Sequence, residues 1–140
     1  MKVSAEITVS LKIPEVEKAT TEATRLGMRD TIVAIHGDTI KNAQSIGFWE
    51  TGHNARSIAS EVSGMGTVLK GDDAQPEKVV NDAKLEAACY STSGYGGYGE
   101  VGHHTRSGSW VNARPYFRPS LDRHKDELAP NIKSHLENTK

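Results

Sequence analysis

The chain has 140 residues, which fits one ordinary domain, over residues 1–140, that can bury a core without disulfides or a structural metal. Its net charge of -1 excludes an overall positive field that would attract nucleic acid or anionic lipid. Aromatic residues make up only 6% of the chain, which indicates either loop-like segments or a surface that neighbouring copies complete.

Cys89 is the single cysteine, so no internal disulfide can form and a reducing compartment is expected. It lies in a run of alternating residues, which favours a packed thiol over a nucleophile. The N-terminus lacks a basic region followed by an apolar stretch, and no apolar run reaches the roughly 18 residues that a membrane helix needs. We therefore expect a soluble protein made in the cytoplasm, with no membrane partner.

The first predicted element is a strand over residues 3–13, in which apolar and polar residues alternate without interruption. Pro14 ends this strand and suits the first position of a helix, and Glu15 and Glu17 are favourable in its first turn. Apolar or small residues then recur at spacings of mostly three and four, which predicts a long helix over residues 14–46.

Two glycines leave the continuity of this long helix open. Gly27 and Gly37 each weaken its interior by about 1 kcal/mol, which allows either one bent helix or two shorter ones. A helix of this length in a small domain needs a surface to pack against. Further strands or a neighbouring copy would supply that surface.

The rest of the chain predicts strands and then a helix. Strands are expected over residues 57–63 and 84–92, and the Gly-, Asp- and Lys-rich residues 64–77 between them are expected to form an exposed loop. Apolar residues return at helical spacing over residues 117–138, which predicts a C-terminal helix kinked near Pro130. The order of strand, long helix, strands and helix predicts an α+β domain.

The segment YGGYGEVGHH, residues 95–104, combines four glycines with a histidine pair. It has no Lys, lacks the spacings of the common phosphate-binding glycine motifs, and is followed by no amphipathic helix, so a phosphate cradle is not expected. His103 and His104 are adjacent, so their side chains diverge and cannot easily grip one metal ion. The remaining histidines lack metal-ligand spacing, which favours exposed or loop positions. They are His36, His53, His124 and His135.

A hydrolase or nuclease would belong to a different functional class. His103 or His104 could act as a base beside Arg106 and Glu100, but such clusters arise by chance in polar loops, and no Ser or Cys nucleophile signature accompanies this one. Basic residues near the C-terminus alternate with acidic ones, which is typical of a solvated helix face. They are Arg114, Arg118, Arg123 and Lys125. We predict no catalytic residue, no cofactor and no metal.

The stretch NARPYFRPSLD, residues 112–122, stiffens the chain just before the last predicted helix. Pro115 and Pro119 bias the residues that precede them, Arg114 and Arg118, towards extended conformations. The Tyr-Phe pair between these arginines suits either anchoring of the last helix to the core or a contact between subunits.

Three stretches occur in an order that resembles a known family. They are TGHNARSI (51–58), YGGYGEVGHHT (95–105) and ARPYFRPSLD (113–122). The sequence is similar to the phage minor tail or tail-completion proteins, which are head-to-tail joining components of the neck of long-tailed phages. The positions that match the family pattern are Thr51, Gly52, Arg56, Ser57, Ile58, Tyr95, Tyr98, Glu100, Gly102, Ala113, Arg114, Pro115, Pro119 and Leu121. Thr105 matches less directly, and Phe117 stands one place later than in the pattern. The histidine pair after Gly102 departs from that pattern.

The resemblance implies an α+β fold in which a curved antiparallel sheet packs against the long N-terminal helix, with a C-terminal helix. It implies a non-enzymatic virion protein that is made in the bacterial cytoplasm and assembles as a ring, commonly a hexamer. Phage DNA would pass through this ring without sequence-specific binding. The implied partners are further copies of the chain, the tail tube or tail terminator protein, and head-closure or connector proteins.

Two alternatives stay open beside this interpretation. One is a tail terminator or head-closure protein of the same neck, because these are also small ring-forming α+β domains. The other is a small histidine-dependent nuclease or metal-binding module. Within the matched stretches, we expect Tyr95 and Tyr98 to be packing anchors, and we expect Glu100 to pair with Arg56 or Arg114 at the corner between the sheet and the next loop.

Overall fold

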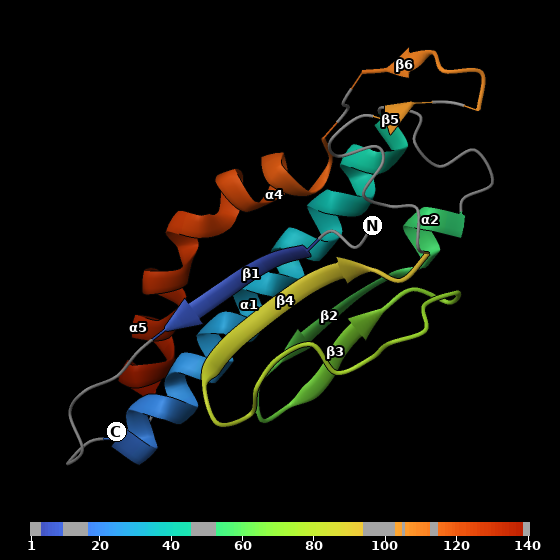
Figure 1. Ribbon diagram of the computed structural model, residues 1–140. Coiled ribbons are helices and arrows are strands. Elements are labelled where there is room, and N and C mark those ends of the chain that lie inside the picture. Colours follow the sequence, from blue (N-terminus) through green and yellow to red (C-terminus); the bar gives the residue numbers. More distant parts are fainter. Residues whose placement is uncertain are drawn as a thin grey trace.

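The structure, a computed structural model, describes residues 4–9, 17–45, 53–93, 103–104, 106–112 and 115–138. Its main feature is an antiparallel sheet with strand order β1-β4-β2-β3 (Figure 1). The strands are β1 (Ser4–Val9), β2 (Ile58–Val62), β3 (Gly66–Lys70) and β4 (Leu85–Ser91). The helices are α1 (Glu17–Ser45), α2 (His53–Arg56), α4 (Phe117–His124), the 3-10 turn η2 (Lys125–Glu127) and α5 (Leu128–Asn138). A separate short hairpin joins β5 (His103–His104) to β6 (Trp110–Val111). The predicted α+β class, with an antiparallel sheet, a long N-terminal helix and a C-terminal helix, is confirmed.

The central strands β2 and β4 send alternate residues to the two faces of the sheet. Ile58 and Val62 of β2, and Ala87 and Cys89 of β4, belong to the larger hydrophobic core on the helix side. Their neighbours along each strand point to the opposite face, as the twofold repeat of a strand requires. β2 and β4 lie one residue inside each end of the predicted ranges 57–63 and 84–92.

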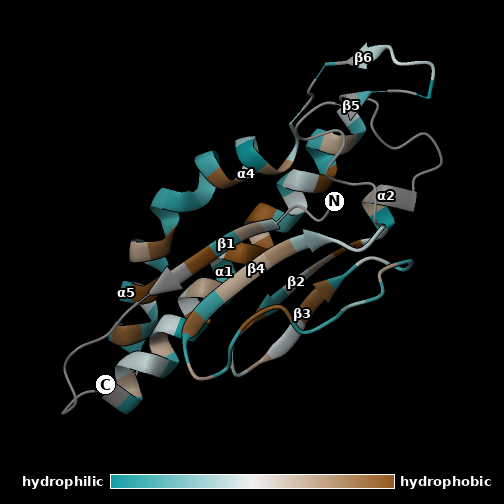
Figure 2. Cartoon of the chain, viewed as in Figure 1, coloured by the Kyte–Doolittle hydropathy of each residue, from teal (hydrophilic) through white to brown (hydrophobic). Residues whose placement is uncertain are grey.

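Helix α1 runs unbroken from Glu17 to Ser45 across the sheet. Met28, Ile32 and Ile35 recur at spacings of four and three, so they share one face, and all are fully buried in the core. These three residues form the buried face of α1, whereas α4 is largely hydrophilic (Figure 2). Gly27 and Gly37, which allowed a break in the predicted helix, do not interrupt it.

The C-terminal helices run antiparallel to α1, because residues later in this segment contact residues earlier in α1. The predicted single helix over residues 117–138 is divided, but the division lies at η2 and not at Pro130. Pro130 instead occupies the first turn of α5, where a backbone N–H has no partner within its own helix, so the proline ring is tolerated.

The predicted exposed loop over residues 64–77 is corrected by the structure, because residues 66–70 of this range form β3. Gly64 and Gly66 both have positive φ and lie at the turn between β2 and β3, and the Met65 N–H donates to the Val62 carbonyl across it. The glycines that suggested a loop therefore mark a tight hairpin.

Residues 71–84, which connect β3 to β4, cover the face of the sheet that the helices leave open. Ala74 and Val80 are buried there against Ala59 and Tyr90 of the sheet. Side chains of the sheet also fix this segment, since a Glu61 carboxylate oxygen accepts from the Val79 N–H at 2.9 Å. Both faces of the central strands are thus covered.

Candidate functional site

The predicted site residues divide between those that the structure describes and those that it does not. Thr51, Gly52, Tyr95, Tyr98, Glu100, Gly102 and Arg114 lie outside the described residues. The expected pairing of Glu100 with Arg56 or Arg114, and the expected packing roles of the two tyrosines, therefore also lie outside them. Arg56, Ser57, Pro115, Phe117 and Pro119 are described.

Arg56 holds a corner at the start of β2, which we call the β2 corner (residues 56–57, 71–75 and 92). Its Nε donates to the Asp73 carboxylate at 2.7 Å, and its carbonyl accepts from the Asp73 N–H at 3.0 Å. A Cβ at Gly71 would overlap the Arg56 carbonyl, so only glycine fits at this close approach. The sequence predicted a charged partner for Arg56 but did not point to Asp73.

Ser57 joins the first matched stretch to the end of β4. The Ser57 carbonyl accepts from both the N–H and the hydroxyl of Thr92, at 2.9 Å and 2.7 Å. The Thr92 hydroxyl oxygen in turn accepts from the Gln75 N–H at 3.1 Å. Thr92 lies three residues before the glycine- and tyrosine-rich stretch in the chain, so the β2 corner joins the first matched stretch to the end of β4.

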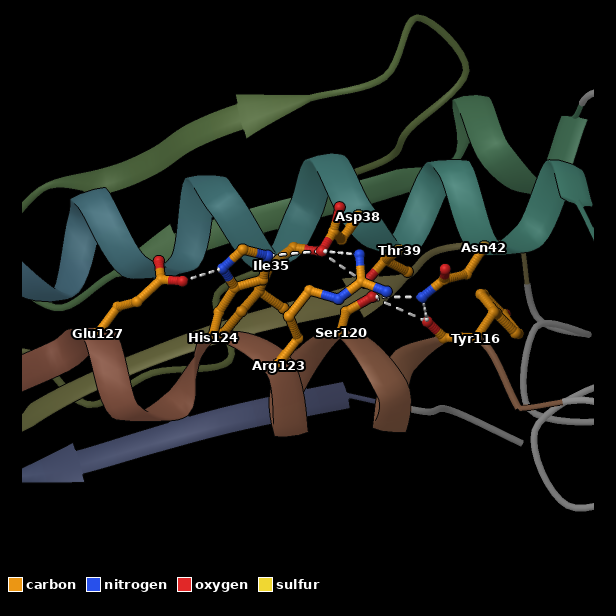
Figure 3. Close-up of polar contacts among 9 residues, drawn as sticks. All are labelled: Ile35, Asp38, Thr39, Asn42, Tyr116, Ser120, Arg123, His124 and Glu127. Carbon is orange, nitrogen blue, oxygen red and sulfur yellow. Dashed lines mark hydrogen bonds and ion pairs between the residues drawn. The ribbon is translucent and has the colours of Figure 1, made fainter.

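The Tyr-Phe pair of the third matched stretch anchors the C-terminal helices to the core. Tyr116 and Phe117 are 0% and 2% exposed, and their ring centroids lie 4.7 Å apart. Asn42 of α1 donates to the Tyr116 carbonyl at 3.3 Å and to the Ser120 hydroxyl at 2.9 Å (Figure 3). The sequence left open whether this pair anchors the last helix to the core or contacts another subunit, and these contacts favour the anchor.

The prolines of this stretch act differently from the prediction. Arg118 was expected to be extended because it precedes Pro119, but it lies in the first turn of α4. Pro119 is the third residue of that helix, where its missing N–H would have no helical partner. Pro115 and Pro119 are both exposed.

A second set of polar contacts joins α1 to the C-terminal helices, and we call it the helix seam. An Asp38 carboxylate oxygen accepts from His124 Nε2 at 2.5 Å and from Arg123 at 3.1 Å (Figure 3). His124 Nδ1 lies 2.7 Å from a Glu127 carboxylate oxygen. A ring that donates from both nitrogens to carboxylates is the protonated imidazolium, so the arrangement fits a charged His124.

The electrostatics of the seam follow from these contacts. Burial opposes the charged form of His124, but hydrogen bonds to Asp38 and Glu127 outweigh it and raise the pKa of His124 above its ordinary value. The hydrogen bond from His124 lowers the pKa of the Asp38 carboxyl, with Arg123 adding to the same direction. Each partner thus stabilises the charged form of the other.

The seam continues along α5. His135 Nε2 lies 2.7 Å from an Asp30 carboxylate oxygen, and the Asn131 amide donates to the Thr31 hydroxyl at 2.9 Å. A Cβ at Gly27 would come within 2.5 to 2.8 Å of Ile132, including its backbone. Gly27 therefore permits the close approach of α5. From the sequence alone, this glycine is expected only to weaken the helix.

His36 contradicts the expected exposed position. It is 2% exposed, and its Nδ1 forms a 2.7 Å hydrogen bond with the hydroxyl of Ser60, which is fully buried. Burial lowers the pKa of His36 to about 4, so the ring is neutral at pH 7. Neighbouring Cys89 is a buried free thiol whose pKa burial raises to about 12, as expected for a packed cysteine.

No family model, no curated protein and no solved structure matches the chain. Among the residues that the structure describes, no group of three or more His, Cys, Asp or Glu side chains could hold a metal ion. No helix within that part of the chain is long and apolar enough to cross a bilayer.

Proposed function

We propose that this protein is a structural component of the neck of a long-tailed phage. It forms an oligomeric ring, commonly of six copies, that joins or completes the tail at the interface between head and tail. The observation that carries the proposal is the position of the matched stretches. Their described residues form the contacts that connect neighbouring elements, at the β2 corner and at the N-terminal end of α4.

The contacts of three residues support this most directly. Arg56 and Ser57 tie the start of β2 to the segments that flank β3 and β4. Phe117 fixes the C-terminal helices to the core that α1 and the sheet share. These residues hold neighbouring elements in fixed positions. Such rigidity suits an assembly protein, because it must present rigid surfaces to its partners.

The proposed partners follow from the same assignment. Copies of the chain contact one another in the ring, the tail tube or tail terminator lies on one side, and head-closure or connector proteins lie on the other. Phage DNA passes through the channel without sequence-specific binding, which the near-neutral charge of the chain favours. The protein is non-enzymatic and resides in the virion after synthesis in the bacterial cytoplasm.

Electron microscopy of particles assembled without this protein tests the proposal. We expect separate DNA-filled heads and finished tails of normal length, with whole particles restored when the wild-type chain is supplied. Overlong tails would instead identify a tail terminator, and heads that lose their DNA would identify a head-closure protein. Whole particles in normal yield would contradict a role in the neck altogether.

A further inference from the structure

Four large hydrophobic side chains are exposed among the described residues, and their distribution is uneven. They are Val33, Met65, Leu69 and Trp110, at 39%, 37%, 38% and 54% exposure. Met65 and Leu69 lie on the hairpin of β2 and β3, whereas Trp110 lies on the hairpin of β5 and β6. The two hairpins thus carry three of the four residues, and Val33 stands alone on α1.

The first place is the Trp110 hairpin (residues 103–104 and 106–111), which projects beyond the end of the main sheet (Figure 1). His104 packs edge-on against the Trp110 ring, with ring centroids 5.0 Å apart, and its Nδ1 lies 3.2 Å from the Gly108 carbonyl oxygen. These contacts orient an indole that still exposes over half its surface. Arg106 in the same turn is exposed and has no ion-pair partner among the described residues.

The second place is a shallow and open depression beside β3, with a volume of about 440 Å³, which we call the β3 groove. It is lined by Thr67, Val68, Leu69, Lys70 and Pro76. β3 is the last strand in the sheet order, so one of its edges is unpaired within the described part of the chain, and hydrophobic residues lie along it (Figure 2). Asp72, just beyond this strand, is exposed and has no ion-pair partner among the described residues.

We propose that the Trp110 hairpin of one copy inserts into the β3 groove of the next copy. The indole would pack on Leu69 and Pro76, and the positive charge of Arg106 would pair with the negative charge of Asp72. Trp and Arg are the residue types most often found at the energetic centre of protein interfaces. The inference rests on the self-assembly part of the proposed function and names the contact that produces it.

The positions of the two surfaces determine the kind of assembly. The hairpin and the groove lie apart in the fold (Figure 1), so one copy does not fill its own groove in this conformation. A contact between two different surfaces is head-to-tail, and repetition of such a contact closes into a ring when the rotation between copies allows it. Each copy therefore offers one hairpin and receives one.

Cysteine cross-linking tests the contact directly. Ser109→Cys places a thiol beside Trp110, and Thr67→Cys places one in the groove, at two exposed positions that leave Trp110 and Leu69 intact. The native Cys89 is buried and does not compete. After mixing and mild oxidation we expect disulfide-linked dimers of one variant with the other. The matched control is Ser109→Cys mixed with Val33→Cys, which carries its thiol on an exposed position of α1. Equal cross-linking in both mixtures, or none, would overturn the proposal.

A mixing experiment tests the head-to-tail geometry. Trp110→Ala removes the hairpin anchor and Leu69→Arg blocks the groove, and each should weaken self-association by about 30-fold, as measured by light scattering. Mixed together, the two variants retain one intact hairpin and one intact groove, so we expect dimers of one copy of each. Because both residues are exposed, circular dichroism should show native folds. Variants that assemble like the wild type, or a mixture that stays monomeric, would overturn the contact.

The outcomes separate this inference from the proposed function. Trp110→Ala protein that still forms rings and still yields whole particles would overturn the contact and leave the neck function standing. Specific cross-links together with normal particles in the absence of the protein would support the contact and contradict the neck function. Loss of particles with Leu69→Arg but no cross-linking between copies would assign the groove to another protein, which overturns the inference.

Discussion

Helix α1 contacts the sheet on one side and the C-terminal helices on the other, and the two contacts differ in chemistry. Towards the sheet it presents the buried Met28, Ile32 and Ile35, with one polar pair between His36 and Ser60. Towards the C-terminal helices it presents Asp30 and Asp38, each bound by a histidine. The sheet side is held mainly by burial, whereas the C-terminal helices add to the buried Tyr116 and Phe117 the directed contacts of the helix seam, whose strength depends on protonation and salt.

The largest expected effect is on the sheet side. Ile35→Ala should lower the free energy of unfolding by about 2–5 kcal/mol, because it removes a fully buried side chain and leaves a cavity. Val33→Ala in the same helix is the matched control, since Val33 is 39% exposed and should change stability by less than about 0.5 kcal/mol. Denaturant unfolding of both variants measures the difference, and equal losses would contradict the assigned orientation of α1.

The next largest effect is a loss of stability in acid, caused by protonation of His36 on the sheet side of α1. His36 binds a proton near pH 6.5 when unfolded but only near pH 4 when folded, so unfolding takes up a proton in this interval. Stability should therefore fall by about 3 kcal/mol as pH drops from 6.5 to 4. Unfolding of His36→Gln protein over the same range should lack this loss. An identical pH dependence in both proteins would count against a buried neutral His36.

A pair of glycine substitutions compares a tightly packed position of α1 with a position where an added Cβ has open space. Gly27→Ala should destabilise the protein by about 1–3 kcal/mol, because the added Cβ meets the backbone of Ile132. Gly37→Ala should instead stabilise it by up to about 1 kcal/mol, since a Cβ there meets nothing within 4 Å. Thermal unfolding measures both, and stabilisation by both substitutions would contradict the close approach of α5.

The smallest effect comes from the ion pairs of the seam. His124→Gln should cost about 1 kcal/mol at pH 6 and low salt, because the contacts are partly exposed. The folded pKa of His124 is raised, so its stabilisation is fully present below pH 6.5 and is lost as pH rises through the folded pKa. The difference between wild type and variant should shrink at alkaline pH and at high salt. A difference that grows with pH would contradict the charged His124.

Together the two histidines predict that the free energy of unfolding changes with pH in opposite directions below and above pH 6.5. His36 lowers stability as pH falls below 6.5, and His124 lowers it as pH rises above that value. The contribution of these two groups to stability therefore peaks near pH 6.5. The double variant with His36→Gln and His124→Gln should show a flatter profile than either single variant.

The elements that local periodicity encodes could be predicted from the sequence. Helical spacing in α1 reflects burial of one face, so neighbouring residues record it. Alternation in β4 marks the face of Leu85, Ala87 and Cys89, but it gave no sign that Ala88 and Tyr90 on the other face are buried as well. His36 carried a usable signal as well, because it follows Ile32 by four residues and so shares its buried helix face. Its polar ring made an exposed position the default expectation.

The contacts of the seam and the corner carry no comparable local signal. His124 and Asp38 are 86 residues apart in sequence, and His135 and Asp30 are 105 apart. Nothing in the spacing near either residue distinguishes these pairs from the solvated charges around them, such as Arg118. β3 was hidden for another reason, since its flanking glycines have the composition of a loop as well as that of a tight turn.

Joining of heads and tails in vitro tests whether this protein connects them, as we propose. Extract from cells that produce the same phage without this protein supplies heads and tails, and purified wild-type chain is added. We expect the number of infectious particles to increase with added protein, and heads and tails to pair in the electron microscope. No increase from correctly folded chain, with heads and tails still separate, would contradict that proposal.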